Sequence, residues 1–344
     1  MDVVLGIESS CDETAAALVT SDGQILAQRI ASQDEEHAPY GGVVPEIAAR
    51  AHAQRLAPMI EAVLGDAGLA LNDCSAIAAT AGPGLIGGVM VGLVSAKALA
   101  MASDKPLLAI NHLEGHALSP RLADPALDFP YALLLVSGGH CQILRVDGVG
   151  QYRRLATTID DALGEAFDKS AKILGLGYPG GPAVERLALQ GDPRAVPLPR
   201  PLLGSKEPHF SFAGLKSAVM RAHERGEHKN SDIAASFQQA AVDCVLDRLG
   251  VALSGQADLP ALVVAGGVAA NETVRGALEE FASARSMRFT APPMALCTDN
   301  AAMIAWAGCE RLPLAQSDPL DFRARPRWPL DPGAEKVRGA GVKA

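Results

Sequence analysis

Residues 131–148, YALLLVSGGHCQILRVDG, decide the fold because they repeat a pattern found at the start of the chain. The pattern is an apolar run, a turn of small residues, an alternating run and then Asp-Gly. Residues 3–23, VVLGIESSCDETAAALVTSDG, follow the same order. Short apolar and alternating runs bounded by turn residues indicate strands, and Asp-Gly marks a hairpin. We therefore predict two related halves, each opening with a β-meander.

The segments that follow each meander alternate between helical and strand patterns. In the first half we predict a third strand, a helix, a strand, a helix and a strand at 25–32, 45–66, 76–80, 86–101 and 107–110. In the second half, YRRLATT (152–158) reads as a third strand. Residues 261–278 read as strand, Gly-rich turn and helix. This alternation predicts an α/β protein with mixed sheets.

Three turns of small residues, around 9–12, 137–139 and 266–268, follow predicted strands. Such turns let the backbone approach a ligand closely, and their N–H groups form nests for anions. Duplicated domains that present such turns are the plan of the actin, Hsp70 and hexokinase fold. We therefore predict that duplicated two-lobed fold, with mixed sheets and a central nucleotide cleft.

The expected domain bounds follow from this duplication. The N-terminal lobe is predicted at 1–118, completed by a C-terminal helix at about 300–325. The C-terminal lobe is predicted at 119–299, and residues 326–344 as a tail.

Composition narrows the class of protein. The chain has 344 residues, a hydrophobic content of 49% and a net charge of −9, which argues against nonspecific nucleic-acid binding over the whole surface. Six scattered cysteines without a C-x-x-C pair exclude a disulfide framework and a cysteine zinc site, and favour a reducing cytoplasm. The N-terminus has no signal-peptide pattern.

Two segments invite other interpretations. Residues 74–96 carry no charge over a length that could cross a bilayer, but their glycines and Pro83 favour a buried strand, a turn and a buried helix without a membrane span. From Arg323 to Lys343 the chain is locally basic. We interpret that end as a solvated, partly disordered tail in preference to a dedicated RNA contact.

The histidine pair in NHLEGHA (111–117) is the strongest sign of chemistry. His112 and His116 are four residues apart, so on a helix they share a face and can hold a metal ion. The register is not that of the zinc-protease motif H-E-x-x-H. Asp299 in CTDNAAMIAWAG is the best third ligand, although its spacing alone favours a cap for the helix 300–309.

Two further clusters are ambiguous by spacing. Residues 160–185 concentrate Asp, Glu and Lys before the tight loop GLGYPGGP (175–182), and Asp168 there is either a ligand contact or part of a solvated face. Residues 37–52 place Glu46, Arg50 and His52 near one side of a helix, either facing substrate or on an amphipathic surface.

Nine motifs in order from residue 6 to about 308 resemble the universal tRNA threonylcarbamoyladenosine transferase family in its bacterial form. The segments are GIESSCDET, YGGVVPEIAARAH, TAGPGLIGG, NHLEGHA, LLLVSGGHCQ, DDALGEAFDKSAKILGLGYPGGP, FSFAGLKSAV, AGGVAANETVR and CTDNAAMIAWAG. The resemblance covers about 90% of the chain. Cys141 stands where a small hydroxyl residue is common in the family.

The resemblance implies a reaction and a set of site residues. The threonylcarbamoyl group moves from threonylcarbamoyl-adenylate to N6 of adenosine 37 in tRNAs that read codons beginning with adenine, with release of AMP. His112, His116 and Asp299 are implied to bind one metal ion, Fe²⁺ or else Zn²⁺, which overturns the preference for Asp299 as a cap. The implied adenylate contacts are Leu135, Val136, Ser137, Gly138, Gly139, Asp168, Gly181 and Asn271, with Glu185 as a weaker candidate.

We expect each group to have a distinct part in the reaction. The turn Ser137–Gly139 would cradle the phosphate, Asp168 and Gly181 would hold the ribose or threonyl part, and Asn271 the nucleoside. The metal is expected to polarise the carbamoyl carbonyl as a Lewis acid. No general base is identified, and His140 is a weak candidate.

Partners and rival functions complete the expectations. The resemblance implies contact with the tRNA anticodon loop and action with an inactive paralogue, TsaB, and an ATPase, TsaE. A metalloprotease is one rival and a sugar kinase or chaperone-like ATPase is the other. The first lacks the H-E-x-x-H register, and the second has no need of a His-His-Asp set.

Overall fold

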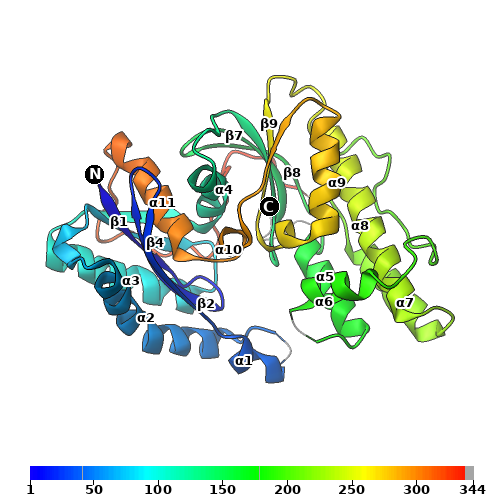
Figure 1. Cartoon of the computed structure of the whole chain (residues 1–344), viewed down its shortest axis with the longest axis horizontal. Coiled ribbons are helices and arrows are strands. Elements are labelled where there is room, and N and C mark those ends of the chain that lie inside the picture. The colour runs from blue at the N-terminus through cyan, green and yellow to red at the C-terminus, as the bar shows by residue number, and fades with distance from the viewer. Residues whose placement is uncertain (41, 178, 338–344) are drawn as a thin grey trace. The chain divides into compact units, whose positions relative to one another are not determined.

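The computed structural model describes residues 1–40, 42–177 and 179–337 (Figure 1). The chain divides into two compact units. Unit 1 comprises Met1–Asp128 and Thr298–Pro332, and unit 2 comprises Phe129–Cys297 with the described residues from Gly333 onward. Each unit is built on one mixed five-stranded sheet.

The sheet of unit 1 has the strand order β3-β2-β1-β4-β5. Its strands are β1 (Val3–Glu8), β2 (Glu13–Thr20), β3 (Ile25–Ser32), β4 (Ala76–Gly82) and β5 (Leu107–Asn111). The meander β1-β2-β3 is antiparallel, and β4 and β5 add to β1 in parallel. The carboxyl ends of β1, β4 and β5 therefore lie at the same edge.

The sheet of unit 2 repeats this topology in the order β8-β7-β6-β9-β10. Its strands are β6 (Tyr131–Val136), β7 (Cys141–Gly148), β8 (Gln151–Thr157), β9 (Ala261–Ala265) and β10 (Arg288–Thr290). Again the meander is antiparallel and the two later strands are parallel to the first. The predicted duplicated α/β architecture with mixed sheets is confirmed, and the predicted strands match within a few residues.

Helices cover both faces of the sheet of unit 1. On one face α2 (Pro45–Ala67) and α3 (Ile86–Ser103) pack on β1, β2 and β4 through a common apolar core. On the other face α11 (Ala301–Arg311) lies against β1 and β2 and against α4 (His112–Ala123). A short helix, α1 (Asp34–His37), follows β3.

Glycines allow α11 to lie unusually close to the sheet. A Cβ on Gly6 of β1 would stand 2.4 Å from the carbonyl oxygen of Ala301 and 2.6 Å from the nitrogen of Ala305. A Cβ on Gly308 would stand 3.0 Å from side-chain atoms of Val4 and Ala78. This close approach fixes where α11 begins, and therefore where Asp299 lies.

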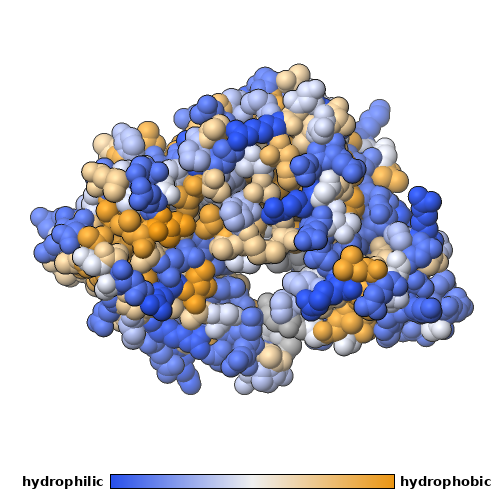
Figure 2. Space-filling view, viewed as in Figure 1, coloured by the Kyte–Doolittle hydropathy of each residue, from blue (hydrophilic) through white to orange (hydrophobic). Residues whose placement is uncertain are grey.

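Unit 2 has one large core between its sheet and a layer of helices. The helices are α5 (Leu163–Ile173), α6 (Gly180–Ala188), α7 (Ala213–Arg225), α8 (Asn230–Ala252), α9 (Glu272–Ser283) and α10 (Met294–Cys297). In this core the rings of Phe167 and Phe237 pack edge to face, with their centroids 5.0 Å apart. On the molecular surface, hydrophilic residues cover most of the face shown, with hydrophobic areas on both units (Figure 2).

The unit bounds differ from the predicted domain bounds. The predicted division between 118 and 119 falls inside α4, which runs on to Ala123, and the contacts divide after Asp128. Residues 298–332 all belong to unit 1, so the predicted tail from 326 begins within that unit. The helix predicted at about 300–325 ends at Arg311. In the tail predicted from Arg323, the arginines up to Arg327 are exposed, but the main chain is hydrogen-bonded to unit 1 at Arg325 and Trp328, so the prediction of disorder is wrong there. Arg338 and Lys343 lie outside the described residues.

Helix α3 accounts for much of the uncharged stretch at residues 74–96. It is long and apolar enough to cross a membrane by length and composition alone. One side packs on β4 and α2. The prediction of a buried helix is wrong for the other side, where Ile86, Met90 and Val94 are 47%, 51% and 55% exposed. Both sides of the helix are apolar, which accounts for its high hydropathy.

Candidate metal centre and substrate loops

The histidine pair projects from the first turns of α4, which starts directly after β5. Asn111 caps this helix, since its side-chain oxygen accepts a hydrogen bond from the nitrogen of Leu113 at 2.9 Å. Gly115 lies between the histidines, where a Cβ would come within 2.8 Å of Ile304 on α11. His112 and His116 are 7% and 1% exposed, so both rings are held inside unit 1.

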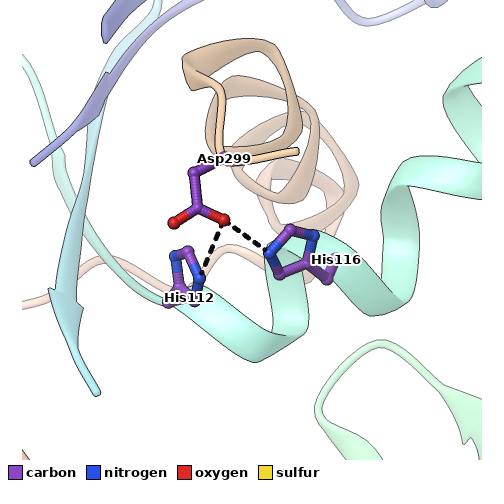
Figure 3. Close-up of side chains that lie close together, drawn as sticks. All are labelled: His112, His116 and Asp299. Carbon is purple, nitrogen blue, oxygen red and sulfur yellow. Dashed lines mark hydrogen bonds and ion pairs between the residues drawn. The ribbon is translucent and has the colours of Figure 1, made fainter. Parts of the chain in front are cut away.

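Asp299 faces both histidines because another residue caps α11. The N-cap is Asn300, whose side chain accepts from the nitrogen of Met303 at 2.9 Å. The spacing-based preference for Asp299 as the cap is therefore wrong. The Oδ1 atom of Asp299 lies 3.5 Å from Nε2 of His112 and 3.0 Å from Nε2 of His116 (Figure 3).

The three side chains fit a divalent metal ion. Each side chain offers one ligand atom, and these three atoms all lie within 4.8 Å of one another. Ligand atoms at about 2.1 Å from a tetrahedral metal are about 3.4 Å apart, close to the two separations from Asp299. Two imidazoles and one carboxylate are a donor set used for Zn²⁺ and for non-haem Fe²⁺.

Glu8, at the end of β1, is hydrogen-bonded to Nδ1 of His112, the ring nitrogen that does not face Asp299. Its Oε2 atom lies 3.0 Å from Nδ1 of His112 and accepts a hydrogen bond from the hydroxyl of Thr80 at 2.5 Å. Its Oε1 atom accepts from the nitrogen of Ser10 at 2.6 Å. A carboxylate on Nδ1 directs the Nε2 lone pair toward a metal. Our sequence reasoning missed Glu8, although a charged residue ending a wholly apolar strand was a usable signal.

The electrostatics of this cluster are strongly coupled. Burial opposes ionisation of Asp299, but the facing His112 and His116 outweigh it and hold the pKa of Asp299 well below its usual range. Burial likewise disfavours the imidazolium of His112, yet Asp299 and Glu8 raise the pKa of His112 well above its ordinary value. Burial, with Asp299 and Asp12, raises the pKa of nearby Glu13 to about 10, so that carboxyl is neutral at pH 7. The pocket thus attracts positive charge, which a proton or a metal ion supplies.

The predicted phosphate turn lies at the carboxyl end of β6 in unit 2. Leu135 and Val136 are buried strand residues, while Gly138 and Gly139 are exposed and a Cβ on either would meet no heavy atom within 4 Å. The nitrogen of Ser137 donates to the carbonyl of His140 at 2.9 Å, which closes the turn. The backbone of this turn is therefore open to a ligand.

Two other segments pack against this turn. A Cβ on Gly164, at the start of α5, would stand 2.6 Å from the carbonyl oxygen of Ser137. A Cβ on Gly266, after β9, would stand 2.4 Å from the carbonyl oxygen of Val136. The turns after β6 and β9 thus lie side by side with a helix N-terminus, an arrangement suited to an anion.

The remaining predicted substrate residues make hydrogen bonds within unit 2. Asp168 accepts from the nitrogen of Gly180 at 2.9 Å, at the start of α6, and Gly181 there has open space around its Cβ position. Glu185 accepts from the nitrogen of Glu272 at 2.6 Å. Asn271 caps α9 through Val274, as a helix N-cap does.

Two weaker predictions have separate outcomes. The nitrogen of His140 donates to the hydroxyl of Ser137 at 3.1 Å, within the phosphate turn. On α2, Glu46 and Arg50 are exposed, whereas His52 is buried and lies 2.8 Å from the hydroxyl of Thr14. The three α2 residues therefore do not form one face. Gly41 and Tyr178, from the two Gly-rich segments, lie outside the described residues.

Comparisons with known proteins identify the family of the chain. Residues 24–306 match the family model described as TsaD: tRNA N6-adenosine threonylcarbamoyltransferase. A protein of that description from Erythrobacter litoralis is 81% identical over 344 residues, covering all of both chains. One from Novosphingobium aromaticivorans is 73% identical over 350 residues, again covering all of both.

A solved structure supports the fold. Component A of (R)-2-hydroxyglutaryl-CoA dehydratase from Acidaminococcus fermentans superposes with a TM-score of 0.53 at 19% identity, covering 89% of this chain and 97% of that one. At this identity the likeness concerns the fold alone. The family match and the high identities are decisive: the chain belongs to the TsaD family of tRNA N6-adenosine threonylcarbamoyltransferases.

Proposed function

We infer that this protein transfers the threonylcarbamoyl group from threonylcarbamoyl-adenylate to N6 of adenosine 37, in tRNAs that read codons beginning with adenine. AMP is released. The family match over residues 24–306 supports the reaction. The observation that carries the chemistry is the convergence of two imidazoles and one carboxylate inside unit 1.

We propose that His112, His116 and Asp299 hold one divalent metal ion, Fe²⁺ first and Zn²⁺ as the alternative. When bound, such an ion supplies Lewis acidity that polarises a carbonyl group. Glu8 fixes the ring of His112 through Nδ1. The low pKa of Asp299 keeps its carboxylate ionised and ready to bind a cation.

The proposed substrate contacts lie in unit 2. The open backbone of Ser137–Gly139 binds the adenylate phosphate, and Leu135 and Val136 position that turn from inside the sheet. Asp168 and Gly181 lie at the start of α6 and contact the ribose or threonyl part. Glu185, which is bonded to the first residue of α9, is a further adenylate contact. Asn271 contacts the nucleoside while its side-chain oxygen caps α9.

Proton transfer needs no dedicated side chain in this scheme. The exocyclic amine of adenine is a weak nucleophile, so positioning carries much of the rate. The departing phosphate can accept the proton from the adenine amine. His140 is the alternative proton acceptor. The target base is splayed from the anticodon loop, as chemistry on a base requires.

We propose two protein partners, the inactive paralogue TsaB and the ATPase TsaE, and no membrane. The exposed apolar side of α3 supports a protein partner, because contiguous apolar surface marks an interaction site. Since the opposite side of α3 is packed on β4, the helix stays in unit 1. We place the reaction in the cytoplasm, where tRNA is the substrate.

A reconstituted transfer assay tests the proposal. Wild type and the His112→Ala, His116→Ala double variant each receive adenylate synthase, its substrates, the two partners and unmodified tRNA. Modified adenosine is measured by mass spectrometry of digested nucleosides, and bound metal is measured on the same samples. We expect the double variant to lose both metal and product. Full product from a metal-free variant would remove the metal from the mechanism.

Two controls address the rival functions. Peptide hydrolysis with and without chelator tests a metalloprotease, and we expect none. Stoichiometric iron or zinc in the purified wild type separates the proposed enzyme from a sugar kinase or chaperone-like ATPase, which relies on Mg²⁺.

A further inference from the structure

The chain after α11 forms a fixed structure on unit 1. Residues Asp318–Trp328, here called the strap, run beside β5, the edge strand of the sheet. The nitrogen of Asp318 donates to the carbonyl of Leu107 at 2.8 Å, and its side chain accepts from the nitrogen of Ala109 at 2.8 Å. At the other end, the side chain of Asn111 donates to the carbonyl of Trp328 at 2.9 Å.

The middle of the strap is held by its main chain as well. The carbonyl of Phe322 accepts from the ammonium of Lys97 at 2.6 Å. The nitrogen of Arg325 donates to the carbonyl of Ala81 at 2.7 Å. Gly82, with φ of +135°, makes room for this contact, since a Cβ there would stand 1.8 Å from the carbonyl oxygen of Arg325. The strap is therefore built into the fold of unit 1.

The side chains of its three arginines take no part in that anchoring to β4, β5 and α3. Arg323, Arg325 and Arg327 alternate along the strap and are all exposed. The guanidinium of Arg325 lies 4.7 Å from the ring centre of Phe322 and 4.8 Å from that of Trp328. Within the described part of the chain, Arg323 and Arg327 have no ion pair or hydrogen bond from their side chains. Three positive charges thus project from a main chain that is hydrogen-bonded to unit 1.

Two features of the surroundings make these charges informative. No acidic residue occurs between Asp321 and Asp331, although the whole chain has a net charge of −9. The strap also ends on Asn111, the residue that caps α4 and directly precedes His112. A local cationic surface on an acidic protein, tied to the candidate metal helix, points to an anionic macromolecule.

We propose that the strap is a binding surface for the tRNA substrate, with Arg323 and Arg327 contacting backbone phosphates. This inference rests on the proposed function. Guanidinium groups bind phosphate in a bidentate manner, and phosphate contacts position a nucleic acid without reading its sequence. Arg325, held against two aromatic rings, offers a planar group on which an unstacked base can lie.

The test compares two double variants of the full-length chain. Arg323→Ala with Arg327→Ala removes two charges from the strap. Arg221→Ala with Arg225→Ala removes two exposed arginines from α7 of unit 2 as the matched control. The binding constant of each variant for an unmodified tRNA transcript is measured at salt concentrations between about 50 and 200 mM. The logarithm of the binding constant falls linearly with the logarithm of the salt concentration, with a slope of about 0.7 to 0.9 per phosphate contact, so the slope reports the number of contacts.

We expect the strap variant to bind tRNA more weakly and to lower the salt slope by about 1.4 to 1.8, the sum for two contacts. The KM for tRNA should rise, while kcat at saturating tRNA, metal content and melting temperature stay at wild-type values. The Arg323→Lys, Arg327→Lys variant should recover most of the binding. The α7 control should bind as wild type does.

Three results would overturn the proposal: equal binding by strap variant and control, no measurable tRNA binding by wild type at low salt, or weaker binding explained by lost metal or lost stability. The proposed function is judged separately. Wild type that binds tRNA through the strap but forms no modified adenosine would refute the reaction and leave the binding surface standing.

Discussion

At the scale of single residues, the arrangement around His112 explains how a metal ligand is oriented. The two ring nitrogens face different carboxylates, Glu8 on Nδ1 and Asp299 near Nε2. By contrast, the Nδ1 atom of His116 is buried without a hydrogen-bond partner in the described structure. The ring of His112 is therefore held by carboxylates at both nitrogens, whereas the ring of His116 is held by Asp299 at Nε2 and by packing around Nδ1.

Replacing Glu8 by Gln should weaken metal binding without removing a ligand. We expect the Kd for Zn²⁺ to rise about 10- to 100-fold, because the outer carboxylate orients His112 and raises its basicity. Competition against a chromophoric chelator measures the change. Glu46→Gln, at an exposed position on α2, is the control and should bind Zn²⁺ as wild type does. An unchanged affinity in Glu8→Gln would mean that packing alone orients the ring.

At the scale of elements, the metal cluster depends on how closely α11 approaches β1. Glu8 and Gly6 share β1, and Asp299 lies two residues before the first residue of α11. Because helix and strand touch at Gly6, the ligands from two distant segments fall into register. Backbone packing here sets the geometry of the site.

The Gly6→Ala substitution should therefore disturb both stability and metal binding. The added methyl group meets backbone atoms of α11, which have no rotamer to change, so we expect a loss of about 1–3 kcal/mol in the free energy of unfolding. Metal affinity should fall because α11 is displaced with Asp299. Denaturant unfolding and metal content measure the two effects. Gly138→Ala, where a Cβ meets nothing, should leave stability near wild type. A fully stable Gly6→Ala protein that keeps its metal would contradict the close approach.

At the scale of the whole molecule, metal binding and folding of unit 1 are linked. The three ligands come from α4 and from the segment before α11, so the folded unit brings them together. A ligand that binds only the folded state stabilises it by mass action. The effect belongs to unit 1, which contains all three residues.

We expect Zn²⁺ at a free concentration of about 100 times its Kd to stabilise the wild type by about 2.7 kcal/mol. Thermal unfolding with and without Zn²⁺ should show a higher melting temperature for the metal-bound protein. Asp299→Asn, which keeps the shape but loses the charge, should show a much smaller shift. Equal shifts in both proteins would place the stabilising metal elsewhere.

The sequence by itself determined the repeated meander, the approximate bounds of the main elements and the spacing of His112 and His116. These features are encoded locally, since strand alternation and helical periodicity follow from which side chains must be buried. The family resemblance named Asp299, whereas spacing alone favoured it as a cap.

Only the tertiary structure decided which distant residues meet. Asp299 lies 183 positions from His116, and Glu8 lies 104 positions from His112, so no local pattern relates them. Asn300, and not Asp299, caps α11. The basic C-terminal segment forms the strap because β5 provides hydrogen-bond partners for it and Gly82 leaves space for its main chain. Packing of a helix onto a sheet, and the covering of an edge strand, are long-range events that only the folded chain resolves.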